Sequence, residues 1–458
     1  MSDSDTDLLD EPRRDDEETP ADDTSVTLRE VAGSTLQRDD QEKPADDTPQ
    51  YPVLSVPADG LPALTDTWPA LAKTQAALAR GTGPIAFDTE RAATYRYSNR
   101  AYLIQLRSPE TLTCLIDPIA FQNGRELADL SAFGTAARER EWILHAASQD
   151  LPCMCEVGLR PTRLFDTELA GRLLGLRRVS LGTMIEHYFG LSLLKEHSVA
   201  DWSQRPLPES WTAYAALDVE LLIELRDKLA TELASVGKDE WAAQEFAYIV
   251  ERHLEPPEER PDRFRRLTGS NQIRTRLGLA ILRELWTTRD QIAEDLDRWP
   301  GRIVPDHALT AIALLANNGK APSAGDVRSL AEFRAQRSRV FLRDWQDAVA
   351  RAATLNEKQM PPMRAPRIGP PDPRNWEKTN PQAYARLLAA KPRVVSLAED
   401  LVLPGENLLS PATLRALCWD APAQLDSKTI EFALSGLGAR KWQCELVAPV
   451  LAHAFAAL

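Results

Sequence analysis

The chain has 458 residues, with 54 Lys and Arg against 68 Asp and Glu and a formal net charge of −14. The first 50 residues hold 17 acidic and 5 basic residues, a net charge of −12, so the remaining chain is close to neutral. No run of about 18 apolar residues occurs, and the N-terminus lacks a basic start followed by a hydrophobic stretch. These features argue against a membrane-spanning or secreted protein, and we expect a cytoplasmic protein.

Residues 1–54 are predicted to form a disordered acidic tail. They contain few large apolar groups and repeat the motif PADDT at 20–24 and 44–48. Such a segment cannot bury enough surface to offset the entropy lost on ordering. A role for the tail in mimicking nucleic acid or shielding an active surface remains an alternative. The chain's five cysteines are predicted to be buried free thiols, because no second pair stands at zinc-ligand spacing from Cys153 and Cys155.

Two segments rich in Pro and charge, 255–266 and 360–376, are typical of linkers because they cannot continue a helix. They divide the chain into predicted domains at 55–254, 268–355 and 376–458. The first domain mixes short apolar strands with amphipathic helices, which predicts an α/β fold. Its expected strands are PIAFDTE, AYLIQLR, TCLID and WILHAA. The second and third domains have helical periodicity throughout, which predicts two all-α bundles.

Acidic residues recur in three motifs of the first domain. In PIAFDTE, the period of a buried strand places Asp88 and Glu90 on the same face, where their charges repel unless a cation lies between them. In YAALDVELL, Tyr214 and Asp218 are four residues apart and share one face of a helix. The third motif, HAASQDL, contributes Asp150. Carboxylates are the ligands that Mg²⁺ and Mn²⁺ prefer, and two such ions can promote attack of water on a phosphodiester.

Together, DTE, HAASQDL and the block that ends in YAALDVELL resemble the DEDD exonuclease superfamily, and within it ribonuclease D, over about residues 80–235. The resemblance implies a ribonuclease H-like domain with a mixed sheet and flanking helices. It also implies that two divalent ions, Mg²⁺ or Mn²⁺, bind to the four carboxylates and that Tyr214 orients the attacking water. The sister subfamily has a histidine where this chain has Ala213, so the tyrosine subfamily is indicated. The residue after DTE, usually aromatic in ribonuclease D, is Arg91 here.

The second domain contains LRELWTTRDQIAEDLDRWPGRIVPDHALTAIA, which resembles the HRDC module of ribonuclease D and of RecQ-type helicases. The resemblance implies a helical bundle that contacts nucleic acid. Residues 261–360 hold 17 basic and 12 acidic residues, and this net charge of +5 suits attraction to phosphates, although scattered surface charge is the alternative. LPGENLLSPATLRAL in the third domain resembles a second, more divergent HRDC-like bundle.

Several further residues are candidates for substrate binding. The loop TERAATYRYSNRAY mixes basic and aromatic side chains, as nucleic-acid-binding segments do. The candidates are Arg91, Tyr97 and Arg100 in this loop, and Lys195 and Arg205 beside the motif DWSQRPL. A solvated loop is the alternative. For His145 we expect a strand-end position rather than metal binding, for Asp166 a helix cap, and for Trp202 and Trp211 packing roles.

The resemblance implies a 3′–5′ exoribonuclease that releases nucleoside 5′-monophosphates and trims structured RNA such as transfer RNA precursors. Two alternatives stay open. A DNA-directed 3′–5′ exonuclease would use the same five residues, because recognition of the 2′-hydroxyl is not visible in this sequence. A non-catalytic nucleic-acid-binding protein would be expected to have lost an acidic ligand, yet all four are present. The natural substrate, the preferred metal and the oligomeric state do not follow from the sequence.

Overall fold

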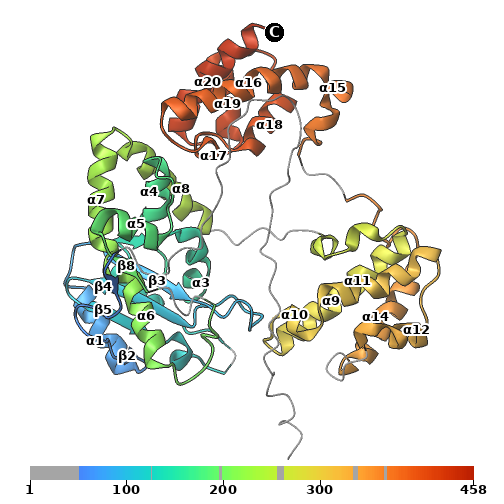
Figure 1. Ribbon diagram of the computed structural model, residues 1–458, viewed down its shortest axis with the longest axis horizontal. Helices are drawn as coiled ribbons and strands as arrows, with labels where there is room; N and C mark the ends of the chain where they lie inside the picture. Colours follow the sequence, from blue (N-terminus) through green and yellow to red (C-terminus); the bar gives the residue numbers. More distant parts are fainter. Residues whose placement is uncertain (1–50, 125, 195–198, 255–261, 334–338, 366–368) are drawn as a thin grey trace, which may run out of the picture. The chain divides into compact units, whose positions relative to one another are not determined.

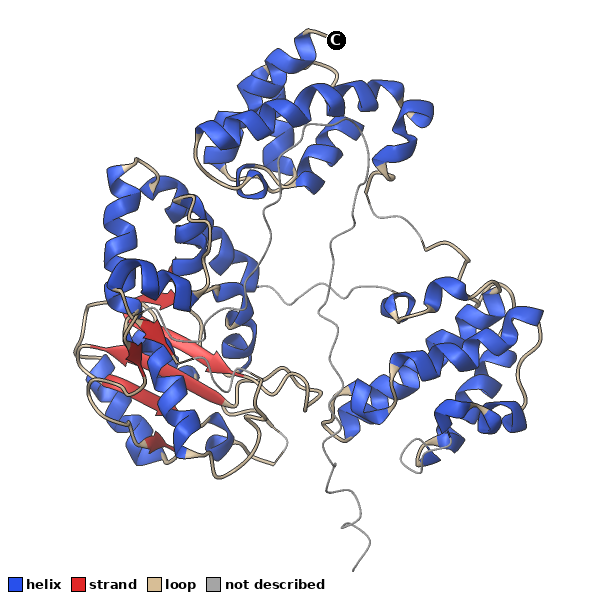
Figure 2. Ribbon diagram, in the orientation of Figure 1, coloured by secondary structure: helices blue, strands red, loops and turns tan. Residues whose placement is uncertain are grey.

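A computed structural model describes residues 51–124, 126–194, 199–254, 262–333, 339–365 and 369–458. We refer to 51–254 as the α/β region, 262–365 as the first helical region and 369–458 as the second helical region (Figure 1). Within these ranges, strands occur only in the α/β region (Figure 2). The predicted α/β fold followed by helical bundles is therefore confirmed. Residues 1–50 of the predicted tail lie outside the described residues, whereas Val53 and Leu54 form a short strand.

The α/β region is built on a six-stranded mixed sheet with the strand order β2-β5-β4-β3-β6-β7. Strand β4 runs antiparallel to both β3 and β5, whereas β2 is parallel to β5 and β6 is parallel to both β3 and β7. A separate parallel pair joins β1 to β8. The strands are β1 (Val53–Leu54), β2 (Leu64–Thr65), β3 (Ile85–Glu90), β4 (Leu103–Ser108), β5 (Leu112–Ile116), β6 (Glu141–Leu144), β7 (Arg163–Asp166) and β8 (Ser192–Leu193).

Helices flank this sheet, as Figure 1 shows. Helix α6 packs on β3, β4 and β5, and α7 contacts β3 and β6. The helices of the α/β region are α1 (Trp68–Leu78), α2 (Ser131–Ala137), α3 (Leu151–Glu156), α4 (Thr167–Leu173), α5 (Leu181–Phe189), α6 (Glu209–Glu220), α7 (Leu222–Ser235) and α8 (Asp239–Leu254). Two short 3₁₀ turns, η1 (Pro118–Phe121) and η2 (Ala147–Gln149), follow β5 and β6.

Both faces of the sheet are buried, which is why its strands read as nearly continuous apolar runs. On one face, Leu103 packs in a cluster with Ala215 and Ala216 of α6. On the other face, Ile104 belongs to the larger core. Because Glu90 pairs in register with Leu103, its side chain projects from the face that α6 covers. The acidic end of β3 therefore faces α6.

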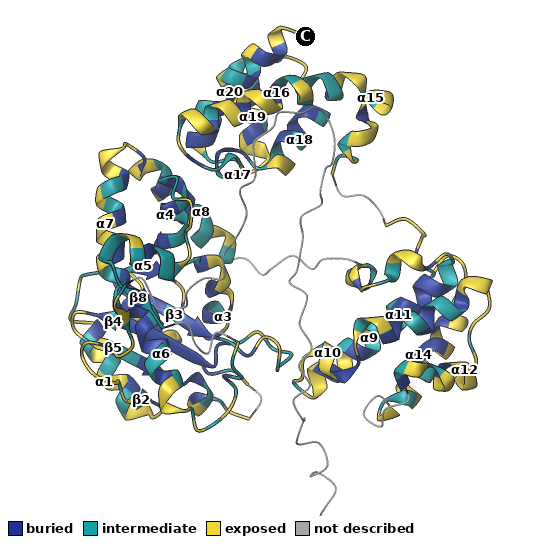
Figure 3. Ribbon diagram, in the orientation of Figure 1, coloured by how far each residue is buried: buried dark blue, intermediate teal, exposed yellow. Residues whose placement is uncertain are grey.

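The two helical regions consist of amphipathic helices whose buried and exposed faces are visible in Figure 3. The predicted all-α character is thus confirmed. The first helical region contains α9 (Arg276–Asp295), α10 (Pro300–Ile303), α11 (Asp306–Leu314), α12 (Ala324–Ser329) and α14 (Leu342–Ala353). The second contains α15 (Trp376–Thr379), α16 (Pro381–Asp400), α17 (Gly405–Leu408), α18 (Pro411–Trp419), α19 (Ser427–Gly436) and α20 (Lys441–Ala456). No helix in the described ranges is long and apolar enough to cross a membrane.

Helix α8 of the α/β region and helix α20 share a buried contact. The rings of Trp241 and Trp442 stack with centroids 4.8 Å apart. The Trp442 indole N–H donates to the Glu245 carboxylate at 2.9 Å, and the Arg440 guanidinium pairs with the same carboxylate at 2.6 Å. The C-terminal helix therefore contributes to the core of the α/β region.

Replacing Trp442 with Ala should destabilise the protein by about 3–5 kcal/mol, because it removes a buried aromatic ring and leaves Glu245 without its indole donor. Phe432→Ala is the matched control, since Phe432 is 84% exposed on α19 and its removal should change stability by less than about 0.5 kcal/mol. Chemical denaturation, followed by far-ultraviolet circular dichroism, measures the free energy of unfolding of both variants. Equal effects of the two variants would contradict this role of Trp442.

Candidate active site

Three of the four predicted acidic ligands meet between β3 and α6. Asp88 and Glu90 lie on β3, and Asp218 lies on α6. One carboxylate oxygen from each of these three residues lies within 4.8 Å of the others. The spacing of two on the strand and the packing of α6 over β3 together produce this cluster.

Asp150 lies beside the three-residue cluster, and its carboxylate interacts with Thr89 and Arg91. It follows the turn η2 and begins α3. Its Oδ1 accepts a hydrogen bond of 2.6 Å from the hydroxyl of Thr89, the residue between Asp88 and Glu90. The Arg91 guanidinium lies 4.0 Å from the same oxygen. The DTE motif therefore supplies two members of the cluster and also a donor for the fourth carboxylate.

Tyr214 stands one helical turn before Asp218 and forms a hydrogen bond with its carboxylate. Burial raises the pKa of Tyr214, and the negative charges of Asp218, Glu90 and Asp88 raise it further. The phenol therefore keeps its proton at neutral pH and can act as a hydrogen-bond donor.

The pKa values of all four carboxylates are raised. Burial is the largest cause for each of them, and it raises the pKa of Glu90 to about 9, that of Asp218 to about 7 and that of Asp150 to about 6. Burial also raises the pKa of Asp88, and the charges of Asp150, Asp218 and Glu90 add to this. So many close carboxylates cannot all ionise unless cations offset their repulsion. An all-oxygen donor set of this kind suits hard divalent ions.

Gln105 is a residue of this site that sequence reasoning missed. It lies on β4 in register opposite Asp88, its side chain is fully buried, and within the described part of the chain neither its amide nitrogen nor its amide oxygen has a hydrogen-bond partner. Buried amides without a protein partner are usually satisfied by water or an ion. The single polar residue in the apolar run LIQL was the available signal.

The structure shows the internal partners of Arg205, for which substrate contact stays a prediction. Its guanidinium makes two bonds of 2.7 Å to the Asp117 carboxylate. The other bonds go to the backbone carbonyls of Tyr102, Trp202 and Gln204. These bonds tie Arg205 to the segment after β5.

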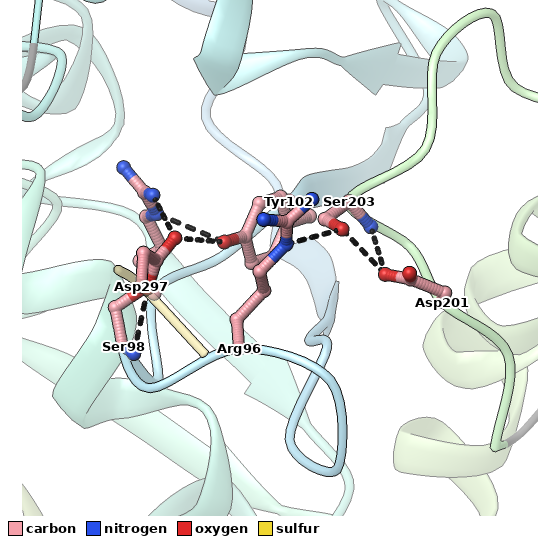
Figure 4. Close-up of polar contacts among 7 residues, drawn as sticks. Arg96, Ser98, Tyr102, Asp201, Ser203 and Asp297 are labelled. Carbon is pink, nitrogen blue, oxygen red and sulfur yellow. Dashed lines mark hydrogen bonds and ion pairs between the residues drawn. The ribbon is translucent and has the colours of Figure 1, made fainter. Parts of the chain in front are cut away.

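Tyr97 and Arg100 also have partners inside the protein, and their substrate contacts stay predictions. The Tyr97 ring packs against the core of the first helical region, and its hydroxyl donates to Asp290 at 3.0 Å. The Arg100 guanidinium pairs with Asp297 at 2.7 Å, and Asp297 also accepts from Ser98 (Figure 4). These side chains join the loop to the end of α9, so their polar groups are already engaged.

Of the remaining candidates, Arg91 stays at the site and Lys195 lies outside the described residues. Arg96, which sequence reasoning did not select, donates to Ser203, and Ser203 in turn bonds to Asp201 (Figure 4). No local pattern marks this pair, because its members are 107 positions apart.

The packing roles expected for other residues are confirmed. Asp166 caps α4 by accepting from the N–H groups of Glu168 and Leu169. His145 lies after β6, and burial lowers its pKa to about 4, so it is neutral. Trp202 is fully buried. The five cysteines are free thiols as predicted, but only Cys153, Cys418 and Cys444 are buried, whereas Cys114 and Cys155 are partly exposed.

Comparison with known proteins agrees with this geometry. Residues 64–234 match the family described as 3'-5' exonuclease, residues 278–349 match the HRDC domain, and residues 369–455 match the 3' to 5' exonuclease C-terminal domain. Ribonuclease D of Shewanella sp. (strain ANA-3) is 32% identical over 266 residues, which cover 57% of this chain and 65% of that protein.

Two crystal structures share the fold over most of the chain. That of Escherichia coli RNase D, described as an exoribonuclease involved in structured RNA processing, matches with a TM-score of 0.61 and 27% identity, covering 82% of this chain and 98% of its own. A protein from Bifidobacterium adolescentis matches with a TM-score of 0.79 and 35% identity, covering 89% and 100%. The chain belongs to the ribonuclease D family. The resemblance predicted from the DTE, HAASQDL and YAALDVELL motifs is thereby confirmed.

Membership of the ribonuclease D family also bears on the third predicted domain. The sequence predicted a second HRDC-like bundle at 376–458, and residues 369–455 match the model of an exonuclease C-terminal domain instead of the HRDC model. The helical content expected there is present, with α15 to α20 covering most of this range.

The raised pKa values predict how pH affects the stability of this ribonuclease D family member when metal is removed by a chelator. A carboxyl group with a raised pKa favours folding in its neutral form, and this contribution is lost as pH rises through the folded-state value. Because an ordinary carboxyl group titrates at about pH 4 and the folded-state values are about 6 for Asp150, about 7 for Asp218 and about 9 for Glu90, the loss should begin at about pH 4 and continue to about pH 9.

Asp218→Asn removes one charge from the cluster. Without metal, its melting temperature should therefore exceed that of the wild type by an amount that grows from about pH 4 to about pH 7, the folded-state value of Asp218. Differential scanning calorimetry measures the difference, and saturating Mn²⁺ should reverse it because only the wild type gains full binding energy. A difference that stays constant with pH would show that the site carboxylates are not electrostatically strained.

Proposed function

We propose that this protein is a divalent-metal-dependent 3′–5′ exoribonuclease that hydrolyses the terminal phosphodiester of RNA and releases nucleoside 5′-monophosphates. The observation that carries the proposal is the convergence of Asp88, Glu90 and Asp218 within 4.8 Å, with Tyr214 one turn away on α6. Membership of the ribonuclease D family supports RNA as the substrate class. Structured precursors such as transfer RNA are the proposed substrates.

Asp88, Glu90, Asp150 and Asp218 are the proposed ligands of two ions, Mg²⁺ or Mn²⁺. When bound, such ions would supply charge stabilisation and make water acidic enough to act as a nucleophile at neutral pH. The chain itself contributes a fixed set of oxygen donors on a rigid strand and a rigid helix. That rigidity matters because errors of about 1 Å in positioning reduce rates strongly.

Tyr214 is the proposed orienting group for the attacking water. Because its pKa is raised, it keeps its proton and acts through a hydrogen bond, not as a general base. Its hydrogen bond to Asp218 keeps the phenol directed at the cluster. Arg91, whose side chain is 25% exposed, is the proposed contact for the terminal nucleotide. It occupies the position that is usually aromatic in this family.

The domain boundaries proposed are an acidic tail at 1–54, the exonuclease at 55–254, the HRDC domain at 268–355 and a C-terminal helical domain at 376–458. The net charge of +5 over residues 261–360 supports contact of the HRDC domain with RNA phosphates. A cytoplasmic location accords with these substrates.

Asp88→Asn should abolish nearly all hydrolysis, because a neutral amide cannot replace a charged ligand of a hard cation. The measurement is degradation of matched end-labelled RNA and DNA oligonucleotides, with and without Mg²⁺ or Mn²⁺. Asp426→Asn is the control, since Asp426 is an exposed cap of α19 and should leave the rate unchanged. Faster degradation of DNA than RNA by the wild type would identify a DNA-directed exonuclease. Substantial turnover by Asp88→Asn would overturn the assignment of the site.

Tyr214→Phe should lower single-turnover hydrolysis by roughly 10- to 1000-fold, which corresponds to about 1.4–4 kcal/mol of barrier. The change removes only the phenolic hydrogen bond and keeps the ring, so RNA affinity and metal dependence should change little. Tyr188→Phe is the matched control, because it removes a hydrogen bond of 2.6 Å to Glu232 between α5 and α7. A folded Tyr214→Phe protein that cleaves at the wild-type rate would exclude a catalytic role for this residue.

A further inference from the structure

We propose that Asp166 is a positioning residue for Asp150: its carboxylate fixes the turn that presents Asp150 to the acidic cluster. Asp166 ends strand β7, is 3% exposed and contacts no other acidic residue of the cluster among the described residues. This role rests on the proposed metal-ligand role of Asp150. Asp166 would thus be a further residue of the site, and it lies outside the DTE, HAASQDL and YAALDVELL motifs.

The carboxylate of Asp166 accepts four backbone N–H bonds that come from two different segments. Two come from the first turn of α4, Glu168 at 3.0 Å and Leu169 at 3.1 Å. The other two come from the turn after β6, Ala146 at 3.1 Å and Ala147 at 2.8 Å. A helix cap requires only the first pair. The second pair is therefore a separate cross-link between β7 and the β6 turn.

The turn after β6 has an unusual backbone conformation, which the hydrogen bonds to Asp166 stabilise. Ala146 has φ of 58°, in the left-handed region, which is unfavourable for a residue with a Cβ atom. The chain then passes through η2, and three residues of 3₁₀ geometry later it reaches Asp150. The two bonds from Asp166 hold this conformation at the point where β6 ends in register with β7, at Leu144 opposite Asp166.

A second tie lies beside the first. The Nδ1 atom of His145 is 2.9 Å from the hydroxyl of Thr167, the residue that follows Asp166. At the far end of the turn, Thr89 orients the Asp150 carboxylate at 2.6 Å. The backbone position of Asp150 thus depends on β7, and its side-chain direction depends on β3.

Asp166→Ser separates the two functions of this carboxylate. A serine can still cap α4 through its hydroxyl, but it is too short to reach the N–H groups of Ala146 and Ala147. We expect an unchanged helix content. Because partners that orient a metal ligand typically contribute 10–100-fold, we also expect Mn²⁺ affinity, measured by titration calorimetry, to fall by about that factor. RNA hydrolysis should require correspondingly more Mn²⁺.

Three further variants keep the result unambiguous. Asp426→Ser makes the same substitution at the exposed cap of α19, whose carboxylate accepts only from its own helix, and it should leave Mn²⁺ affinity unchanged. Asp150→Asn removes the charge of the proposed ligand itself and therefore gives the largest fall in Mn²⁺ affinity expected from losing Asp150. If Asp166→Ser fails to fold, Thr167→Val tests the neighbouring tie to His145 and should weaken Mn²⁺ binding by about threefold or more.

The outcomes distinguish this inference from the function on which it rests. Wild-type Mn²⁺ affinity in Asp150→Asn would contradict the proposed metal site itself. Loss of Mn²⁺ affinity in Asp150→Asn together with wild-type affinity in folded Asp166→Ser would overturn the positioning role alone. A lower melting temperature of Asp166→Ser with wild-type Mn²⁺ affinity would likewise reduce Asp166 to a structural cap.

Discussion

Mutual repulsion among the carboxylates between β3 and α6 is the constraint on which the rest of this structure depends. Each of these groups is deprived of solvent, and most of them also feel the charge of a neighbour, so burial and repulsion both favour the neutral form. If the backbone were free to relax, repulsion would move these carboxylates apart. Instead, β3 is fixed by strands on both sides, and α6 is fixed by packing on β3, β4 and β5. The scaffold holds in place an arrangement that is favourable only with cations, which is how a metal site is preorganised.

Several polar groups around this cluster contact its members or lie next to them. Thr89 donates a hydrogen bond to the Asp150 carboxylate, and Asp166 accepts from the backbone N–H groups of Ala146 and Ala147 in the turn that precedes Asp150. Tyr214 is held through Asp218. Gln105 offers an unpaired amide on the neighbouring strand, in register with Asp88. The acidic ligands are therefore only the innermost layer of a polar network, and its outer members come from β3, β4, β7 and α6.

Several side chains predicted to bind substrate have partners within the protein that the sequence did not reveal. A basic and aromatic loop near an active site is typical of nucleic-acid contact, but Tyr97 and Arg100 meet carboxylates near the end of α9. Arg205 likewise finds Asp117, which lies 88 positions away. A short motif shows which hydrogen-bond donors a loop carries. It does not show which distant acceptors those donors will contact in the fold. Charge pairing inside a large chain can satisfy the same groups that RNA would.

The sequence by itself determined the features that depend on local periodicity and on chemically restricted residue types. Strand alternation placed Asp88 and Glu90 on one face, helical spacing placed Tyr214 with Asp218, and the apolar runs of β3 and β4 predicted a buried sheet. Only the tertiary structure decided that Asp150 turns toward Thr89, that Asp166 joins two segments, and that Trp442 of the last helix packs on Trp241. The physical reason is the range of the interactions. Backbone geometry repeats every two or 3.6 residues and is visible in a short stretch of sequence. A hydrogen bond or a stacked ring between residues far apart in the chain depends on how whole elements pack, and no local pattern encodes that packing.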